Sequence, residues 1–315
     1  MPDLLLIGLG ILLLTAGGEA VVRGALSAAQ RLGVSPLLAG IVIVGIGTSS
    51  PELVVSVNAA LTGQPDIAVG NVVGSNISNV LLILGICGLI LPLVTTRAAL
   101  MRDGLAMIAA SGLMVALMAG GSLGRFDALL LLLALMAYLV WAYRTERLAP
   151  SADDPDPSPA ALPGGVPLLL LALSGGLLVL IAGSSLLLQG AVGIARDFGL
   201  SEAVIGLTLV AVGTSLPELA VSLLAVMRRQ AGMAVGNILG SNIFNVLGIL
   251  GLAAFLQPLE MARRIVIFDQ WVMLGTSVLL LVFLFPGLRI NRLEAAILLA
   301  GYIVYLGLTL GGAFG

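Results

Sequence analysis

Apolar segments long enough to cross a lipid bilayer follow one another along almost the whole chain. A membrane-spanning helix needs roughly 20 predominantly apolar residues. The chain is 59% hydrophobic and only 10% charged, well outside the composition of soluble domains. Because helices satisfy their backbone polar groups internally, the pattern predicts an all-α polytopic membrane protein with ten transmembrane helices. The predicted spans lie near residues 3–21, 37–61, 67–91, 104–120, 127–143, 166–188, 203–227, 232–257, 269–286 and 293–311.

The one sizeable polar segment, residues 151–165, divides the chain into two halves. Its sequence, SADDPDPSPAALPGG, is acidic and rich in proline, which is typical of a flexible linker. We therefore expect a first five-helix unit at residues 1–150 and a second at residues 166–315. The N-terminal segment lacks a basic n-region, so we expect it to be retained as the first span rather than cleaved as a signal peptide.

Arginine is the only basic residue type in the chain, and its distribution orients the predicted spans. With the N-terminus outside, ten arginines fall in inner connections and four in outer ones, in agreement with the positive-inside rule. We therefore predict a protein of the cell (inner) membrane, with both termini extracytoplasmic and the linker in the cytoplasm. The inner arginines are Arg23, Arg31, Arg97, Arg102, Arg144, Arg147, Arg228, Arg229, Arg289 and Arg292, and the outer ones are Arg125, Arg196, Arg263 and Arg264.

The second half of the chain repeats the first, and adding 166 to a position in the first half gives its equivalent in the second. GIVIVGIGTSSPEL, starting at Gly40, corresponds to GLTLVAVGTSLPEL, starting at Gly206, and AVGNVVGSNISNV at 68–80 corresponds to AVGNILGSNIFNV at 234–246. The repeated motifs thus span residues 40–80 and 206–246. Since each predicted unit has five spans, an odd number, the second unit enters the membrane from the opposite side. Such inverted repeats are typical of secondary transporters, with the binding site near the midplane.

The first repeated motif places a carboxylate directly after a proline inside a span. Proline removes a backbone donor and clashes with the preceding turn, so we expect the helix to break just before Pro51 and again before Pro217. Glu52 and Glu218 would then start the second half-helices, where the helix dipole favours negative charge. Carboxylates, freed carbonyls and hydroxyls that converge on one point would form an oxygen cage of the kind that Ca²⁺ and Na⁺ accept.

The second repeated motif supplies hydroxyls and amides at helical spacing. Ser75 and Asn79 are one turn apart, as are Ser241 and Asn245, so each pair can share a helix face. The other motif asparagines are expected to cap broken ends or to bond between helices. They are Asn71, Asn76, Asn237 and Asn242.

Each of these polar residues also has an ordinary structural interpretation. A serine or threonine in a membrane helix usually bonds back to its own helix, and a single GxxxG is usually a packing notch. An intramembrane glutamate is different, because it costs at least ~2.5 kcal/mol at the centre of a span and is functional by default. We interpret Glu19 as interfacial and Asp66 and Asp103 as ordinary loop charges.

The motifs GTSSPEL with GSNISN, and GTSLPEL with GSNIFN, resemble the two α-repeats of the sodium/calcium exchanger branch of the cation/calcium antiporters. The resemblance covers both motif blocks closely and the ten-span, two-half layout generally. It implies four cation sites. Glu52 and Glu218 would share a calcium site with the backbone carbonyls of Thr48 and Thr214. Sodium sites would use Ser49, Ser75 and the Gly45 carbonyl on one side and Ser215, Ser241 and the Ala211 carbonyl on the other, with Asn79 and Asn245 completing the centre.

Two departures from this family pattern bear on function. Some members, notably the potassium-dependent exchangers, have an aspartate where this chain has Asn245, so the asparagine counts against potassium co-transport. The linker of about fifteen residues is too short to fold into the regulatory calcium-binding domains of animal members.

We therefore expect exchange of Na⁺ for Ca²⁺ by alternating access. Two carboxylates neutralise one Ca²⁺ or two Na⁺ in a site where uncompensated charge is costly, while Mg²⁺ dehydrates reluctantly. A proton-coupled cation antiporter that uses the same glutamates stays open as the alternative. A channel is less favoured, because inverted broken helices are typical of alternating access.

Other function classes lack support in the sequence. The chain has no histidine, and neither HExxH nor a GxSxG nucleophile motif with a histidine partner occurs, so an enzyme is not expected, and no cofactor is expected besides the transported ions. No basic run indicates a nucleic-acid partner. The single cysteine, Cys87, excludes an intramolecular disulfide and is interpreted as a buried, inert thiol. The lipid bilayer is the expected environment, and a monomer is the working expectation for an oligomeric state that the sequence leaves open.

Overall fold

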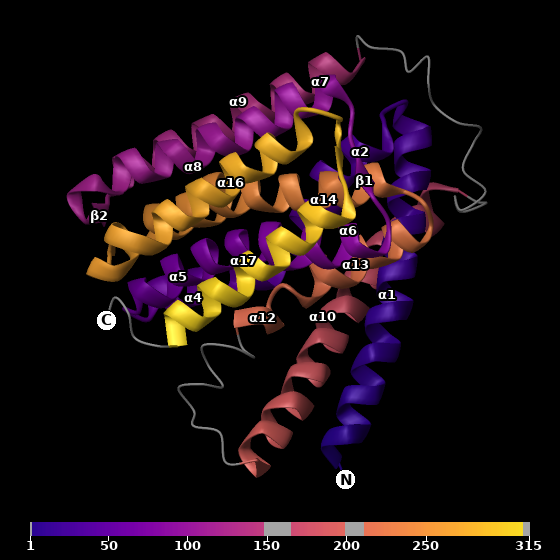
Figure 1. Ribbon diagram of the computed structural model, residues 1–315, viewed down its shortest axis with the longest axis horizontal. Coiled ribbons are helices and arrows are strands. Elements are labelled where there is room, and N and C mark those ends of the chain that lie inside the picture. The colour runs from indigo at the N-terminus through magenta and orange to yellow at the C-terminus, as the bar shows by residue number, and fades with distance from the viewer. Residues whose placement is uncertain (1, 148–164, 199–210, 311–315) are drawn as a thin grey trace.

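The computed structural model describes residues 2–147, 165–198 and 211–310, and these residues are mostly helical (Figure 1). The elements of the first half are α1 (Pro2–Leu32), α2 (Pro36–Ala39), η1 (Gly40–Gly45), α3 (Ile46–Thr48), α4 (Ser50–Leu61), α5 (Pro65–Ser78), η2 (Asn79–Ile83), α6 (Leu84–Ile90), β1 (Leu93–Val94), α7 (Arg97–Ala99), η3 (Leu100–Gly104), α8 (Leu105–Leu117), η4 (Met118–Gly120), β2 (Ser122–Leu123) and α9 (Arg125–Arg147). Those of the second half are α10 (Val166–Asp197), α12 (Ala211–Gly213), α13 (Leu216–Met227), α14 (Ala231–Phe244), η6 (Asn245–Leu250), α15 (Gly251–Leu256), β3 (Leu259–Glu260), η7 (Ile265–Asp269), α16 (Gln270–Leu284), β4 (Arg289–Ile290) and α17 (Arg292–Leu310).

Eight of the described helices are long and apolar enough to cross a membrane, and a ninth span is formed if one bent pair is counted. The protein is therefore an integral, multi-pass membrane protein. The bent pair joins Pro36–Thr48 to Ser50–Leu61 at an angle of 44°. The predicted span at 203–227 lies partly outside the described residues, and its described part includes the shorter apolar helix α13. The predicted total of ten spans and their inverted arrangement thus stay predictions.

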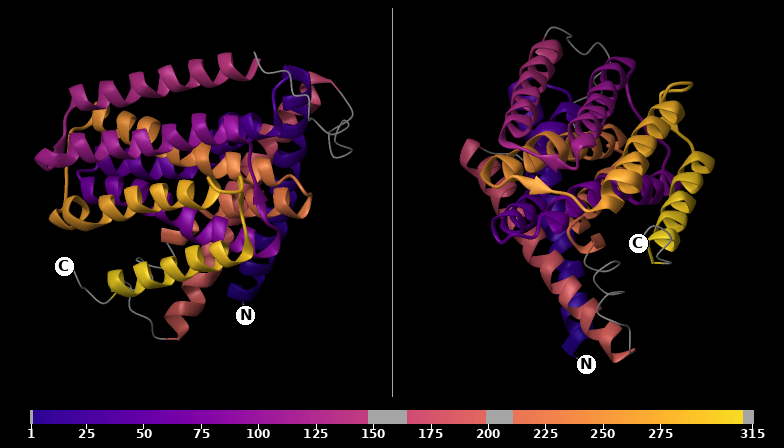
Figure 2. Two further views of the ribbon diagram at one scale, coloured as in Figure 1. Left: turned by 45° about the horizontal axis from the view of Figure 1, so that its top comes forward. Right: turned by 90° about the vertical axis from the view of Figure 1, so that its left-hand side faces the viewer.

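Helices α1 and α10, the two longest, pack side by side through glycines (Figure 1). A Cβ atom added at Gly10 would lie 2.8 Å from the Gly183 carbonyl oxygen, and one added at Gly17 would lie 2.7 Å from that of Gly176. Real Cβ atoms do not approach so closely, so glycine is required at both crossings. The two helices extend beyond the rest of the bundle at the end where the N-terminus lies (Figures 1 and 2).

Helix α1 is joined to the rest of the bundle by an ion pair. Glu19 accepts hydrogen bonds from Arg228, at the end of α13, and from Arg23 on its own helix. About a quarter of the Glu19 and Arg228 side chains is exposed. The interfacial position of Glu19 stays a prediction. The pair fixes one end of α13 against the α1–α10 pair.

The centre of the bundle is formed by α5 with α6 and by α14 with α15, the most buried of the candidate spans. Helices α9 and α17 lie on the outside of the bundle (Figure 2). Two short antiparallel ladders join the halves of the chain, with β1 pairing with β4 and β2 with β3. Cys87 is buried and free, as predicted.

Asp103 is not a loop charge, and that prediction was wrong. It lies in η3 with its side chain fully buried, and it binds the Arg102 guanidinium at 2.7 and 2.9 Å and the Tyr138 hydroxyl at 3.0 Å. Asp269, its equivalent in the second half, forms an ion pair with Arg264 at 3.2 Å and accepts a hydrogen bond from the Tyr305 hydroxyl at 3.1 Å. The carboxylate is tolerated because its neighbours neutralise and hydrogen-bond it. Asp66, by contrast, is exposed and accepts a hydrogen bond from the Ala262 backbone.

Candidate cation-binding site

Two helix breaks carry the candidate site, and both lie where the prolines predict them. Helix α3 ends at Thr48 and α4 begins at Ser50, so Ser49 lies in the break with Pro51 in the first turn that follows. In the second half α12 ends at Gly213 and α13 begins at Leu216, with Pro217 again in the first turn. Each proline lacks the backbone donor that would continue the helix unbroken.

The two glutamates that follow the breaks are fully buried. Each is bound by a serine from the other half of the chain. The Ser215 hydroxyl donates to Glu52 Oε1 at 3.4 Å, and the Ser49 hydroxyl donates to Glu218 Oε1 at 3.0 Å. The carboxylates therefore lie in one shared site between the two breaks.

Asparagines from the second motif position the segment that carries each glutamate. The Asn71 amide donates to the backbone carbonyl of Glu52 at 3.2 Å and to Ser56 at 2.9 Å. Its side-chain oxygen accepts a hydrogen bond of 3.5 Å from Thr214, whose hydroxyl also contacts Glu52. The prediction that these asparagines bond between helices is thus confirmed.

The equivalent network surrounds the second glutamate. The Asn237 amide donates to the Glu218 carbonyl at 3.3 Å and to Ser222 at 2.9 Å, and its oxygen accepts from Thr48 at 3.3 Å. The Thr48 hydroxyl contacts Glu218 as well. Ser56 and Ser222 were missed by the sequence analysis, although they occupy equivalent positions of the repeat, a signal that could have found them.

Four further asparagines meet at the centre of the site. Asn79 donates to the side-chain oxygen of Asn242 at 2.9 Å, and Asn245 donates to that of Asn76 at 3.0 Å. Asn79 and Asn245 are each the first residue of a π-helical segment, η2 and η6. Such segments are frequent at functional sites because they re-aim side chains out of the α-helical pattern.

Several buried oxygens of the candidate site have no hydrogen-bond partner among the residues that the structure describes. Buried polar atoms are nearly always satisfied, so unpaired acceptors in one site indicate a place for an electropositive ligand. They are Glu52 Oε2, Glu218 Oε2, Asn79 Oδ1, Asn245 Oδ1 and Ser75 Oγ.

The Gly45 carbonyl oxygen accepts a hydrogen bond from Ser241, a serine that the family resemblance places in the other sodium site. Ser241, not Ser75, donates its hydroxyl to this carbonyl, at 3.2 Å. The half-helix of one repeat packs against the helix of the other here, as the close approach of Gly45 to Ser241 demonstrates. The grouping of these serines into sodium sites stays a prediction. Ala211 is the first described residue of α12, and its role stays a prediction.

One flank of the site is closely packed against the other half of the chain. A Cβ atom added at Gly236 or Gly240 would collide with the backbone of Leu37 or Ile41. The repeat equivalents of Leu37 and Ile41, positions 203 and 207, lie outside the described residues. Gly70 and Gly74, the equivalents of Gly236 and Gly240, line a cavity of about 410 Å³.

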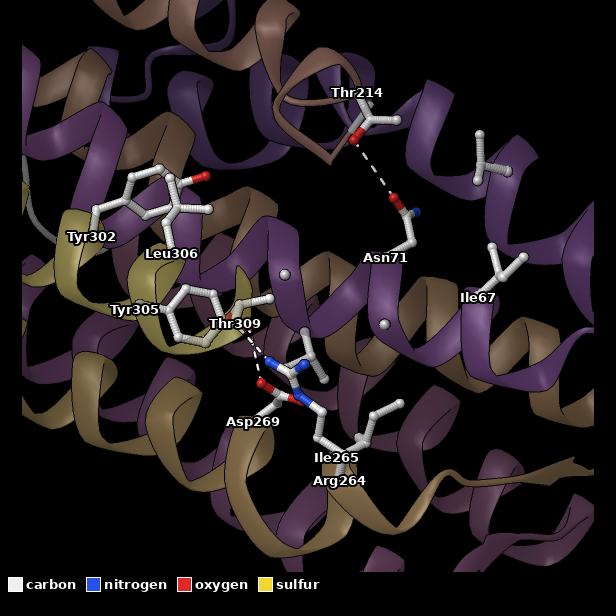
Figure 3. A pocket seen from close by; sticks show the side chains of 14 residues that line it. Ile67, Asn71, Thr214, Arg264, Ile265, Asp269, Tyr302, Tyr305, Leu306 and Thr309 are labelled. Carbon is white, nitrogen blue, oxygen red and sulfur yellow. Dashed lines mark hydrogen bonds and ion pairs between the residues drawn. The ribbon is translucent and has the colours of Figure 1, made fainter. Parts of the chain in front are cut away.

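This cavity extends from the network around Glu52 to a polar cluster on α17 and η7. Asn71 and Thr214 line it at one end, and the Arg264–Asp269 ion pair lines it at the other (Figure 3). The structure thus has a cavity beside the network of Glu52.

Comparisons with known proteins agree with one another. The family model described as sodium/calcium exchanger protein matches residues 3–144 and 168–311. The chain is 40% identical to CaxA of Alkalimonas amylolytica over 303 residues, covering 94% of this chain and 95% of that protein. It is 32% identical over 340 residues to the sodium/calcium exchanger MaX1 of Methanosarcina acetivorans, covering 96% and 97%. A structure of the sodium-calcium exchanger NCX_Mj superposes with a TM-score of 0.83 at 31% identity, covering 97% of this chain and 98% of that one.

Proposed function

The chain belongs to the sodium/calcium exchanger protein family, and on that premise we propose that it exchanges Na⁺ for Ca²⁺ across the membrane. Family membership makes the protein an antiporter of cations that include calcium. What we propose beyond this is which ion is exchanged for calcium and which residues bind the two ions.

The observation that carries the proposal is the pair of fully buried carboxylates with unpaired oxygens. Within the described part of the chain, Glu52 and Glu218 each keep one oxygen without a partner, and the side chains that hydrogen-bond to the two carboxylates are serines and threonines. A buried carboxylate that lacks a positive partner is strongly destabilising. Cations that enter from solution would remove that cost, so the site is suited to hold positive charge transiently.

The number and kind of oxygens suit the two ions of the proposal. One Ca²⁺, or two Na⁺, balances two carboxylates, so the ions compete for the same groups. Ca²⁺ accepts six to eight oxygen ligands in flexible geometry, whereas Mg²⁺ requires a tighter octahedron and gives up water reluctantly. Competition at shared carboxylates is sufficient to couple the two fluxes in opposite directions.

We assign the ligands in four groups. Glu52 and Glu218, with the backbone carbonyls of Thr48 and Thr214, form the calcium site. The contact between Ser241 and the Gly45 carbonyl supports one sodium site built from these two residues and Ser49. Ser75, Ser215 and the Ala211 carbonyl form the other, and Asn79 and Asn245 complete the centre.

We infer transport by alternating access from the two helix breaks at equivalent positions of the repeat, since inverted broken helices are typical of that mechanism. The proposal includes ten spans in two inverted units, residues 1–150 and 166–315. Both termini are extracytoplasmic and the linker at residues 151–165 lies in the cytoplasm of a cell (inner) membrane.

Proton coupling is the second candidate function, because the same buried carboxylates can bind protons in place of Na⁺. The two functions are separated by calcium uptake into proteoliposomes with imposed Na⁺, K⁺ and H⁺ gradients in turn. Sodium exchange predicts uptake that follows only the Na⁺ gradient. Uptake that follows a pH gradient in the absence of Na⁺ would replace the proposal with its proton-coupled alternative.

A further inference from the structure

Ser78 is a buried hydroxyl beside the candidate site that the assignment above leaves without a role. It lies at the end of α5, immediately before Asn79, with 2% of its surface exposed. Its Oγ atom is 3.4 Å from Ser215 Oγ and 3.0 Å from the backbone carbonyl oxygen of Ser75. Ser78 therefore connects two residues that we assign to the same sodium site.

The hydroxyl proton of Ser215 has to change its acceptor when a cation binds. In the structure Ser215 donates this proton to Glu52 Oε1. A hydroxyl that ligates a cation through its oxygen lone pair points its proton away from that cation, and the Glu52 carboxylate faces the same cation. The hydroxyl then needs a second acceptor, because an unsatisfied buried donor costs about 1–3 kcal/mol.

Ser78 Oγ is in position to be that acceptor. Ser78 Oγ can donate to the Ser75 carbonyl at 3.0 Å or to Ser215 Oγ at 3.4 Å. A serine hydroxyl has one proton and two acceptor lone pairs, so the shorter contact, to the carbonyl, takes the proton when Ser215 donates. One Ser78 lone pair is then available to the Ser215 hydroxyl. The result is a short relay from Ser215 through Ser78 to the Ser75 carbonyl, in which every hydroxyl keeps a hydrogen bond.

The other half of the site has no such hydroxyl at the equivalent position. Adding 166 to 78 gives Phe244, whose side chain has no hydrogen-bonding atom. Ser49, the equivalent of Ser215, donates to Glu218. Position 244 offers Ser49 no hydroxyl as a second acceptor. The two halves thus differ at this position, which lies beside the hydroxyl ligands.

We propose that Ser78 is a positioning residue for Na⁺, accepting the Ser215 proton when Na⁺ occupies the site formed by Ser215 and Ser75. It thereby makes this sodium site stronger than the one that contains Ser49. The proposal rests on the function proposed above. Because the calcium site uses the two glutamates and backbone carbonyls, Ser78 acts on Na⁺ and not on Ca²⁺.

The test compares Ser78→Ala with the parent in two assays. Thermal unfolding in detergent is followed against NaCl and against CaCl₂, with choline chloride to hold ionic strength, since a ligand stabilises the folded state in proportion to its occupancy. Loss of one hydrogen bond predicts about a three- to tenfold rise in the Na⁺ concentration for half-maximal stabilisation. The Ca²⁺ concentration for half-maximal stabilisation stays unchanged, and the same division is expected for the half-saturation constants of exchange in proteoliposomes.

Two further variants make the result interpretable. Ser78→Thr keeps the hydroxyl and is expected to bind Na⁺ like the parent. Ser111→Ala removes a buried membrane serine whose hydroxyl pairs with that of Ser277. It is expected to leave the half-maximal concentrations of both Na⁺ and Ca²⁺ unchanged. Equal weakening of Na⁺ and Ca²⁺ in Ser78→Ala, or unchanged Na⁺ binding, would overturn the proposal. A parent that binds Na⁺ but does not exchange it for Ca²⁺ would instead overturn the proposed function, and the binding assay would still decide the role of Ser78.

Discussion

Asn76 and Asn242 each donate the side-chain amide to the backbone carbonyl of the other, at 3.1 and 3.2 Å. The two residues occupy equivalent positions of the repeat, so this reciprocal pair relates the equivalent motifs around one point. Where equivalent positions on the two sides of that point differ in their contacts, the difference therefore reflects either the conformation of the protein or a specialised role of one side.

Replacing either buried glutamate by glutamine should abolish calcium transport while the protein remains folded. The amide keeps the shape of Glu52 or Glu218 and removes half of the negative charge that faces Ca²⁺. A lost partner in a buried charge pair costs about 3–5 kcal/mol, so Ca²⁺ affinity should fall by about 10²-fold or more. Calcium flux into proteoliposomes measures the effect, with Glu260→Gln on an exposed carboxylate as the control. Near-normal exchange in either site variant would refute the assignment.

Alanine at Gly240 should weaken the packing of the two halves of the chain. Gly240→Ala drives a methyl group into the Ile41 backbone and should lower stability by about 1–3 kcal/mol, measured by thermal unfolding in detergent. Gly112→Ala is the control, because no described residue lies within 4 Å of a Cβ atom added there, and it should unfold like the parent. Unchanged stability in Gly240→Ala would contradict the close packing of α14 on Ile41.

Removing the arginine that joins α13 to α1 should change the transport rate more than it changes stability. Arg228 bridges two helices through Glu19, whereas Arg23 binds Glu19 from the same helix. A partly exposed ion pair contributes only about 0–1 kcal/mol to folding. We expect Arg228→Gln to alter the turnover rate and to weaken hydrogen-exchange protection at the end of α13, with Arg23→Gln close to the parent. Identical behaviour of the two variants would argue against a bridging role.

Aspartate at position 245 should make transport depend on pH. The Asn245 amide donates to Asn76 Oδ1 at 3.0 Å, so an ionised aspartate would put two oxygens in contact and add a third negative charge to the centre. The variant should therefore hold a proton or an additional cation near neutral pH, whereas the parent exchanges without K⁺. Flux measured across pH, with and without K⁺, tests both statements. A strict K⁺ requirement in the parent, or an unchanged pH profile in the variant, would remove Asn245 from the cation centre.

Cysteines at positions 66 and 154 should react with impermeant reagents from opposite sides of the membrane. Asp66 is exposed at the start of α5, and Asp154 belongs to the predicted cytoplasmic linker. In a Cys87→Ser background, Asp66→Cys should label from outside and Asp154→Cys from inside. Labelling of both from the same side would contradict the ten-span, inverted arrangement.

The sequence predicted the features that depend on single residues and their neighbours. Proline chemistry located the breaks at Ser49 and before Leu216, and the cost of intramembrane charge marked Glu52 and Glu218. It did not predict which equivalent oxygens meet. The repeat relates Ser75 to Ser241, but only the packing of one half on the other decides which of them reaches the Gly45 carbonyl.

Other misses have the same origin in tertiary structure. Asp103 stands beside Arg102 at the edge of an apolar segment, where hydropathy alone suggests a connecting loop. Its burial depends on contacts with Arg102 and Tyr138. Tyr138 lies on α9, further along the chain, so this contact forms only in the tertiary structure. Similarly, α1 continues to Leu32, beyond the expected end at residue 21, because apolar residues of its later turns such as Val22, Ala25 and Leu26 are buried in the core.

The two short ladders carry a consequence for how the protein is made. Strand β1 pairs with β4 near the other end of the chain, where Leu93 lies opposite Ile290, and β2 pairs with β3. Both partner strands belong to the second half of the chain. When residues 2–147 have been synthesised, the strands of the first half are therefore still unpaired, and the Asn76 amide still lacks its acceptor. Long-range pairing of this kind is formed late and slowly. The first half must persist in the bilayer as an unfinished intermediate until synthesis of the second half supplies its missing partners, and expression of either half alone should yield material prone to degradation.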